Sequence, residues 1–294
     1  MIKTDFFKSK YIKIFELIIS VAISLAFIYV FYKIIGFETF FRFLKEISPV
    51  NIAIAFALYF LSYITRTIRW KITLEIKDFI KLFRITAFNT IFNIFLPFRT
   101  GEFSFFYMLK KENISFKDSA ISFIVVRLFD AISLFTLFFA SLLVYKGAYI
   151  LALVLVLIAP FGIYVIKYLS NFVKIKKLQD FNRDVLTLKN MLTLYILSIG
   201  TFFLKFTSFY FVLPEGVKLS FIESFFASAS GDITTILPIH GLAGIGTYEA
   251  GFVGILVFMG INKELALLSA VFIHLFILLG SAIVGLIALL MRRH

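Results

Sequence analysis

The sequence predicts an all-α, polytopic membrane protein whose two halves are inverted repeats, each with three crossing helices and one re-entrant hairpin. Hydrophobic residues make up 61% of the 294 positions, and the mean hydropathy is +0.99, well above that of soluble domains. Apolar runs of membrane length recur along the chain, and basic residues gather in only some of the segments between them. The absence of cysteine excludes disulfides and thiolate chemistry.

Six apolar runs are expected to cross the bilayer, because each approaches the roughly 20 residues that a spanning helix needs. They cover residues 14–35, 52–64, 121–145, 148–166, 191–213 and 265–291. The second run is short unless the polar residues that follow it are included. The first run follows a cluster of lysines, but it is longer than the apolar region of a signal peptide. We therefore expect an uncleaved first helix.

The net charge of +13 is distributed very unevenly along the chain. Basic residues gather in the N-terminal tail and in segments 66–84, 110–117, 167–189 and 292–293, whereas the loops at 146–147, 214–218 and 263–264 carry almost no excess. By the positive-inside rule, the first group is cytoplasmic and the second is external. This predicts a multi-pass protein of the cell membrane with both termini cytoplasmic. Contact with the lipid bilayer accounts for the basic balance, so no nucleic-acid partner is expected.

The first hairpin is predicted because an apolar arm is followed by a return arm that is too short to cross the bilayer. Residues 80–96 carry several polar side chains and end at a Leu-Pro pair. After the polar loop only residues 103–109 are apolar, and a helix of that length climbs about 10 Å, a third of the hydrocarbon core. We therefore expect a re-entrant hairpin near residues 80–111 that opens to the cytoplasm.

The second half repeats this pattern from the opposite side. Residues 221–237 end at a second Leu-Pro pair, and the return arm 249–259 is again short. Both ends of this hairpin, near residues 220–260, belong to the external group of loops. An odd number of crossings in each half inverts residues 147–294 relative to residues 1–146, which is the plan of many secondary transporters.

The same ionisable pair occurs in both halves. Glu102 is followed by Arg127, and Glu249 is followed by His274 at the same distance along the chain. Asp130 lies one helical turn after Arg127 and therefore on the same helical face. Because non-helical backbone at membrane depth must line a polar cavity or be buried in protein, two hairpin tips entering from opposite sides are expected to meet near the midplane. We expect these side chains to surround one site between the repeats.

The candidate site consists of ionisable and amide side chains expected at that depth: Arg99, Glu102, Arg127, Asp130, Glu249, His274, Asn93 and Asp232. A charge at the bilayer centre costs at least about 2.5–3.5 kcal/mol, so unpaired charges are not expected there. Two interpretations stay open: the two Glu-centred pairs hold the hairpins to the helices, or they also bind a substrate. The three histidines are widely scattered, so we expect neither a metal nor a cofactor.

Three further groups of residues receive a simpler interpretation. Arg66, Arg69 and Trp70 are expected at a cytoplasmic helix end, where long basic side chains and indole rings anchor to the interface. Asp232 favours a polar cavity inside the second hairpin, although a hydrogen bond to a neighbouring threonine would also bury it. The glycine-rich segment 241–246 has no strand before it and no Lys-Ser/Thr after it, so it predicts a turn rather than a nucleotide-binding loop.

Several segments of the chain carry recognisable motifs. Residues 93–102 read Asn-Ile-Phe-Leu-Pro-Phe-Arg-Thr-Gly-Glu, and this segment resembles the Asn…Leu-Pro-x-Arg-x-Gly-Glu motif of the lysylphosphatidylglycerol synthase transmembrane, or flippase-like, family. Residues 126–130 resemble its Arg-x-x-Asp helix, 237–249 its Pro-Gly-Gly-Leu-Gly-x-x-Glu segment, and 68–70 its Arg-Trp helix end. Two departures are present. The second glycine cluster is interrupted, and His274 stands where members often carry arginine.

The resemblance implies a lipid-translocating membrane unit, which some members fuse to a soluble aminoacyltransferase or glycosyltransferase domain. The sequence given carries no such domain, so lysyl transfer is not expected from it alone and we expect a protein that is not an enzyme. A separate glycosyltransferase or lipid-modifying enzyme is an expected kind of partner. The oligomeric state is left open.

The leading hypothesis is a translocase for an anionic lipid, either a phospholipid or a polyprenyl-phosphate-linked lipid. Arg99 and Arg127 would hold the phosphate, since guanidinium groups suit phosphate oxygens. Glu102 and Glu249 would orient these arginines, and His274 would couple movement to protons, because histidine changes charge near neutral pH. Two alternatives stay open: an ion- or proton-coupled carrier of a small polar anion, and an intramembrane enzyme that acts on a lipid headgroup.

Overall fold

The computed structural model describes residues 2–74, 76–95, 101–170, 180–181, 184–236 and 241–291, with the side chains before Ile18 and those of residues 163, 165, 166, 169 and 170 excepted. Its regular structure is helical and includes no strand in these ranges, which confirms the all-α prediction. The elements are α1 (Ile2–Ile34), α2 (Gly36–Leu44), α3 (Pro49–Thr73), α4 (Phe79–Phe95), α5 (Glu102–Lys111), α6 (Phe116–Tyr145), α7 (Tyr149–Ser170), α9 (Leu188–Phe211), α10 (Phe221–Thr234), the short 3₁₀ helix η2 (Leu242–Gly244), α11 (Thr247–Phe258) and α12 (Lys263–Leu290).

Four of the described helices are long and apolar enough to cross a membrane by themselves: α3, α6, α9 and α12. They correspond to four of the six predicted crossings. The first predicted crossing meets this criterion only when Ile18–Ile34 is taken together with α2, and these two segments are bent by 82°. The described part of α7 contributes a shorter apolar helix, Tyr149–Gly162. The protein is therefore a multi-pass membrane protein.

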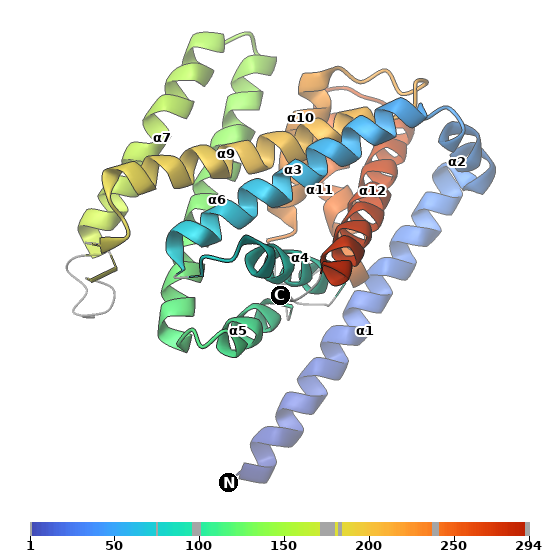
Figure 1. Ribbon diagram of the computed structural model, residues 1–294. Helices are drawn as coiled ribbons and strands as arrows, with labels where there is room; N and C mark the ends of the chain where they lie inside the picture. Colours follow the sequence, from blue (N-terminus) through green and yellow to red (C-terminus); the bar gives the residue numbers. More distant parts are fainter. Residues whose placement is uncertain are drawn as a thin grey trace.

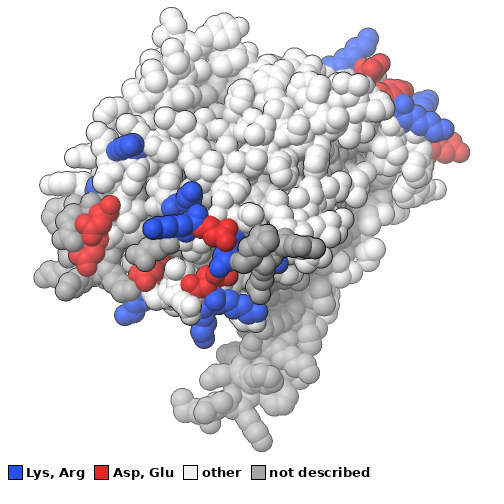
Figure 2. Space-filling view, viewed as in Figure 1, with Lys and Arg blue, Asp and Glu red and all other residues white. Residues whose placement is uncertain are grey.

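The molecular surface has the distribution of charge that a bilayer requires. On the face shown in Figure 2, charged side chains gather along one edge and at the opposite corner, and a broad band between them carries almost none. Large apolar side chains are exposed on several long helices, among them Ile150 on α7, Ile196 on α9 and Leu286 on α12. An exposed apolar surface of this extent is stable only in contact with lipid or another apolar partner.

Several helices begin at polar side chains that cap their free backbone amides. Ser115 Oγ accepts from the amide of Asp118 at the start of α6, and Thr187 Oγ1 accepts from the amide of Asn190 at the start of α9. A reciprocal capping box with Ser220 opens α10. Each cap satisfies a donor that the helix leaves unpaired, and such a cap contributes about 1 kcal/mol. The helix starts are therefore encoded locally.

The helices form one bundle in which α3 and α9 pack along each other and α12 packs against α11 and α4 (Figure 1). α6 lies between α7, α9 and α10. Hydrogen bonds reinforce the contact between α3 and α12: Tyr59 Oη and Ser281 Oγ lie 2.8 Å apart, and Tyr63 Oη donates to Ser281 Oγ at 3.1 Å. The bundle thus joins helices from both halves of the sequence.

Two helical pairs correspond to the arms of the predicted hairpins. α4 packs against α5, and α10 packs against α11. The close contact of the second pair requires Gly231, because a Cβ there would lie 2.6 Å from the ring of Tyr248. The turn before α11 places Gly244 and Gly246 at φ values of +81° and +88°, a region that favours glycine. The Leu-Pro tips at 96–100 and 237–240 lie outside the described residues.

Candidate functional site

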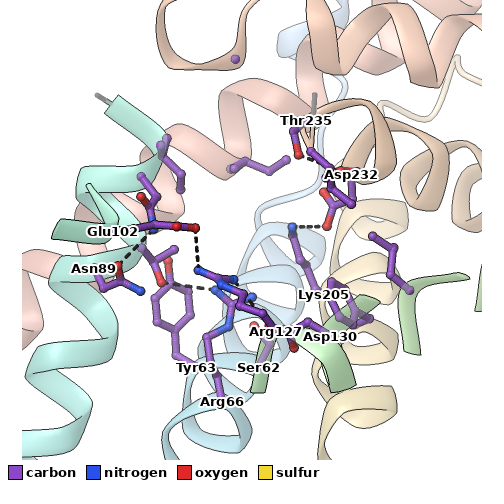
Figure 3. A pocket seen from close by; sticks show the side chains of 18 of the residues that line it. Ser62, Tyr63, Arg66, Asn89, Glu102, Arg127, Asp130, Lys205, Asp232 and Thr235 are labelled. Atoms are coloured by element: carbon purple, nitrogen blue, oxygen red, sulfur yellow. Dashed lines mark hydrogen bonds and ion pairs between the residues drawn. The ribbon is translucent and has the colours of Figure 1, made fainter. Parts of the chain in front are cut away.

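A cavity of about 460 Å³ lies inside the bundle, within the range of about 300–1,000 Å³ that is typical of small-molecule sites (Figure 3). Its wall is built by α3, α4, α6, α9 and α12, by the start of α5, by the end of α10, and by the start of α11 with the turn that precedes it. The ionisable side chains that line it are Arg66, Arg69, Glu102, Arg127, Asp130, Lys205, Asp232, Tyr59, Tyr63, Tyr248 and His274.

The first predicted pair is present on one side of this cavity. Arg127 Nη2 lies 3.4 Å from Glu102 Oε1, and Arg127 Nη1 lies 3.5 Å from Asp130 Oδ2. The Arg127 guanidinium also lies over the ring of Phe123, 4.9 Å from its centroid. The Arg127 and Glu102 side chains are 34% and 27% exposed. This pair therefore connects α5 to α6 and remains accessible from the cavity.

The second predicted pair is buried. His274 Nδ1 lies 2.6 Å from Glu249 Oε1, and His274 Nε2 lies 2.9 Å from the carbonyl oxygen of Ala243. The imidazole lies between a carboxylate oxygen and a carbonyl oxygen. A neutral histidine has one N–H and can donate to only one of them. Both contacts are hydrogen bonds only when His274 and Glu249 together hold one further proton. Glu249 Oε2 also accepts from the amide of Gly246 at 2.8 Å and so caps α11.

A third ion pair, between Lys205 and Asp232, was not predicted. Lys205 Nζ on α9 lies 2.5 Å from Asp232 Oδ2 on α10, and both side chains are largely buried. The alternative in which a threonine buries Asp232 is wrong, because Thr235 Oγ1 donates to the backbone carbonyl of Asp232 and Thr234 Oγ1 to that of Gly231. The sequence did contain a signal for Lys205, since it is a lone charge inside an apolar run.

The arginines of α3 are also part of the cavity, and the prediction that they anchor the helix end at the interface is wrong for Arg69. Its side chain is fully buried, forms an ion pair with Asp130 and donates from Nη1 to Ser198 Oγ at 2.7 Å. Arg66 lies one turn earlier and donates from Nη1 to Thr90 Oγ1 at 3.2 Å. Trp70 is buried as well and packs on Phe105 at a centroid distance of 4.5 Å.

The structure brings most of the predicted site residues to one cavity. Its wall includes six of them: Glu102, Arg127, Asp130, Asn93, Asp232 and His274. Glu249 does not line the cavity but contacts His274, which does. Asn93 Nδ2 donates to Asn89 Oδ1 at 3.1 Å, and both amides face the cavity. Arg99 lies outside the described residues. In Figure 3 the Glu102 and Arg127 side chains occupy one side of the opening, and Lys205 and Asp232 occupy the other.

The wall of the cavity is chemically suited to an anion. Among the described residues of the wall, α3, α6 and α9 contribute four strongly basic side chains, and hydroxyl and amide groups lie between them. Within the described part of the chain, no group of three or more His, Cys, Asp or Glu side chains has a spacing that could hold a metal ion.

Comparison with known proteins agrees with this architecture. The model of one protein family, described as the lysylphosphatidylglycerol synthase TM region, matches residues 17–285, which is nearly the whole chain. No curated protein matches the chain significantly. The match includes the membrane-spanning helices and all the described residues that line the cavity, and it confirms the resemblance seen in the motifs. The chain belongs to the family of the lysylphosphatidylglycerol synthase TM region.

Proposed function

We propose that the protein is a translocase that moves an anionic lipid between the two leaflets of the cell membrane. The observation that carries this proposal is a cavity of about 460 Å³ inside a bundle of membrane-spanning helices, with four strongly basic side chains in the described part of its wall. Charges at such depth are costly and in membrane proteins commonly mark a pathway for substrates or ions. Membership of the family links the protein to the handling of membrane lipids.

The size of the cavity favours a substrate whose headgroup enters while its acyl chains stay in lipid. A volume of about 460 Å³ suits a small polar group and is too small for a whole phospholipid. Guanidinium groups such as that of Arg127 bind phosphate oxygens with two parallel hydrogen bonds. In this proposal Arg127 and Arg99 contact the phosphate, and Glu102 orients Arg127 at 3.4 Å in the absence of substrate.

We further propose that the two hairpins are re-entrant and give access to the cavity from opposite sides in turn. The halves 1–146 and 147–294 would then form an inverted repeat with both termini cytoplasmic. Supporting observations are the two helical pairs, α4–α5 and α10–α11, and the two Glu-centred pairs that share one spacing along the chain. His274 lies between two acceptors beside the cavity, and in this proposal it couples movement to a proton gradient.

The experiment is a leaflet-exchange assay in proteoliposomes that contain fluorescent phosphatidylglycerol, with a membrane-impermeant quencher added outside. In vesicles with wild-type protein, inner-leaflet lipid should reach the external quencher faster than in protein-free vesicles. We expect Arg127→Gln to slow this exchange. A matched control is Arg84→Gln on α4, because Arg84 does not line the cavity and its Nη1 donates to the carbonyl of Met291 at 3.0 Å. Exchange no faster than in protein-free vesicles would overturn the proposal.

A second candidate function is the ion- or proton-coupled carriage of a small polar anion, which the volume of the cavity favours equally. Uptake of a water-soluble anion by the same vesicles, without lipid exchange, would identify this function. We also propose that the protein has no catalytic activity of its own. A covalent product formed from a purified lipid headgroup would instead identify an enzyme, with a carboxylate such as Glu102 as base.

A further inference from the structure

The strongest unassigned feature of the cavity is a surplus of hydrogen-bond donors on one turn of α3. Arg66 and Arg69 are one turn apart, so both guanidinium groups lie on the same face of the helix, and both line the cavity. Two neighbouring positive charges on one helical turn repel each other. An arrangement of this kind is expected where an anion binds between or beside the two groups.

Arg66 differs from the other basic side chains of the described cavity wall. Arg69 is paired with Asp130, Arg127 with Glu102 and Asp130, and Lys205 with Asp232. Arg66 instead has a hydroxyl partner, Thr90, and its guanidinium lies 5.8 Å from the centroid of the Tyr63 ring. No carboxylate of the described residues forms an ion pair with it.

Unsatisfied donors occur on both arginines. Arg66 Nε is buried and has no acceptor, and the same holds for Arg69 Nε and Nη2. A buried donor without an acceptor is costly, and the cost is greater when the group is charged. Since three such nitrogens belong to two side chains on one turn, a single ligand with several acceptor oxygens would satisfy them together.

The charge balance of the described wall indicates the sign of the charge on that ligand. Arg66, Arg69, Arg127 and Lys205 face three carboxylates, those of Glu102, Asp130 and Asp232. The His274–Glu249 pair adds no net charge when it holds its proton. Among these described side chains one positive charge is in excess, which suits an anionic group with at least two acceptor oxygens.

We propose that the Arg66–Arg69 turn is a binding site for a phosphodiester, the singly charged group that joins glycerol to the headgroup in many phospholipids. Its two unesterified oxygens would accept from Arg66 and from the free nitrogens of Arg69, while Asp130 keeps its pairing with Arg69. This inference rests on the proposed function for the identity of the substrate. It adds Arg66 and Arg69 to Arg127 and Arg99, which the proposed function assigns as phosphate ligands.

The test measures lipid binding directly, so that its outcome is separate from transport. Purified protein in phosphatidylcholine nanodiscs is titrated with phosphatidylglycerol, phosphatidic acid or inorganic phosphate, and bound ligand is counted by native mass spectrometry. We expect phosphatidylglycerol to bind best, and Arg66→Gln to weaken its binding about tenfold to a hundredfold, since one charge-assisted hydrogen-bonding group is lost. Arg84→Gln, outside the cavity, should bind like wild type.

Two controls separate the site from the fold and from the transport proposal. Trp70 is the single tryptophan and lies in the cavity wall, so an unchanged emission spectrum shows that a variant is folded there. If Arg66→Gln does not fold, Arg66→Lys keeps the charge but loses the planar fork, and a loss of several-fold is expected. Wild-type affinity in a folded Arg66 variant, or tighter binding of phosphatidic acid or inorganic phosphate, overturns the inference.

The two proposals fail in different ways. Selective loss of phosphatidylglycerol binding in Arg66→Gln supports the phosphodiester site even when wild-type protein exchanges no lipid between leaflets, an outcome that would overturn only the proposed transport. Conversely, lipid exchange by wild type with unchanged binding by Arg66→Gln would overturn the site and leave the transport intact. An equal loss in Arg84→Gln would also overturn the assignment, because that residue does not line the cavity.

Discussion

Variants of the ion pair between Lys205 and Asp232 test whether this part of the cavity is only structural or also binds a substrate. Lys205 Nζ lies 2.5 Å from Asp232 Oδ2, with 14% and 10% of the two side chains exposed. Replacing Lys205 with methionine leaves a largely buried carboxylate without its ammonium, which costs about 3–5 kcal/mol in comparable pairs. Because the pair borders a polar cavity, we expect a value near the lower end, about 3 kcal/mol.

Removing both charges should have the opposite result. The double variant Lys205→Met/Asp232→Leu leaves no unpaired charge, and replacing a buried pair with apolar groups is commonly neutral or stabilising by about 1–4 kcal/mol. The double variant should therefore be at least about 3 kcal/mol more stable than Lys205→Met alone. If the pair is part of a substrate site, this stable double variant should nevertheless lose lipid exchange in proteoliposomes.

The free energy of unfolding can be followed in mixed detergent micelles by the fluorescence of Trp70. This residue is the single tryptophan, and it packs on Phe105 at a centroid distance of 4.5 Å between α3 and α5. The reasoning about the buried pair is refuted if the double variant is destabilised by the sum of the two single changes. Wild-type lipid exchange by the double variant would show that Lys205 has a structural role alone.

Further predictions concern the second hairpin. Glu249→Ala removes the cap of α11 and the carboxylate partner of His274, so it should lower the free energy of unfolding by about 3–5 kcal/mol, and an unchanged value would contradict the pairing at 2.6 Å. Gly231→Ala should cost about 1–3 kcal/mol, because its Cβ would lie 2.6 Å from Tyr248. The matched control Gly254→Ala, with no atom within 4 Å, should instead gain about 0.5–1 kcal/mol.

The sequence predicted the helices well because the signals that define them are local. The apolar run 121–145 lies within α6, and the arm expected at 80–96 appears as α4, Phe79–Phe95. Polar caps such as Ser220 and the two Leu-Pro pairs mark the ends of helices without reference to the rest of the fold. The short spacing between Glu102 and Arg127 likewise predicted a contact between neighbouring elements along the chain.

Contacts between distant helices were less predictable, and the arginines of α3 show the reason. A basic residue beside an aromatic one near the end of a helix has the same sequence pattern whether it reaches the interface or is buried. Only the packing of α6 and α9 beside α3 brings Asp130 and Ser198 to Arg69 and so offsets the free-energy cost of its burial.

The sequence by itself determined the membrane setting, the family, most helix boundaries and the two Glu-centred pairs, because hydropathy, capping and short spacings act within or between adjacent elements. The tertiary structure alone decided that Arg69 and Lys205 also line the cavity, and which carboxylates they meet. Lys205 meets Asp232 across 27 residues, and Arg69 meets Asp130 across 61 residues. These pairings depend on which faces of the helices turn inward, and that is set by the packing of the whole bundle.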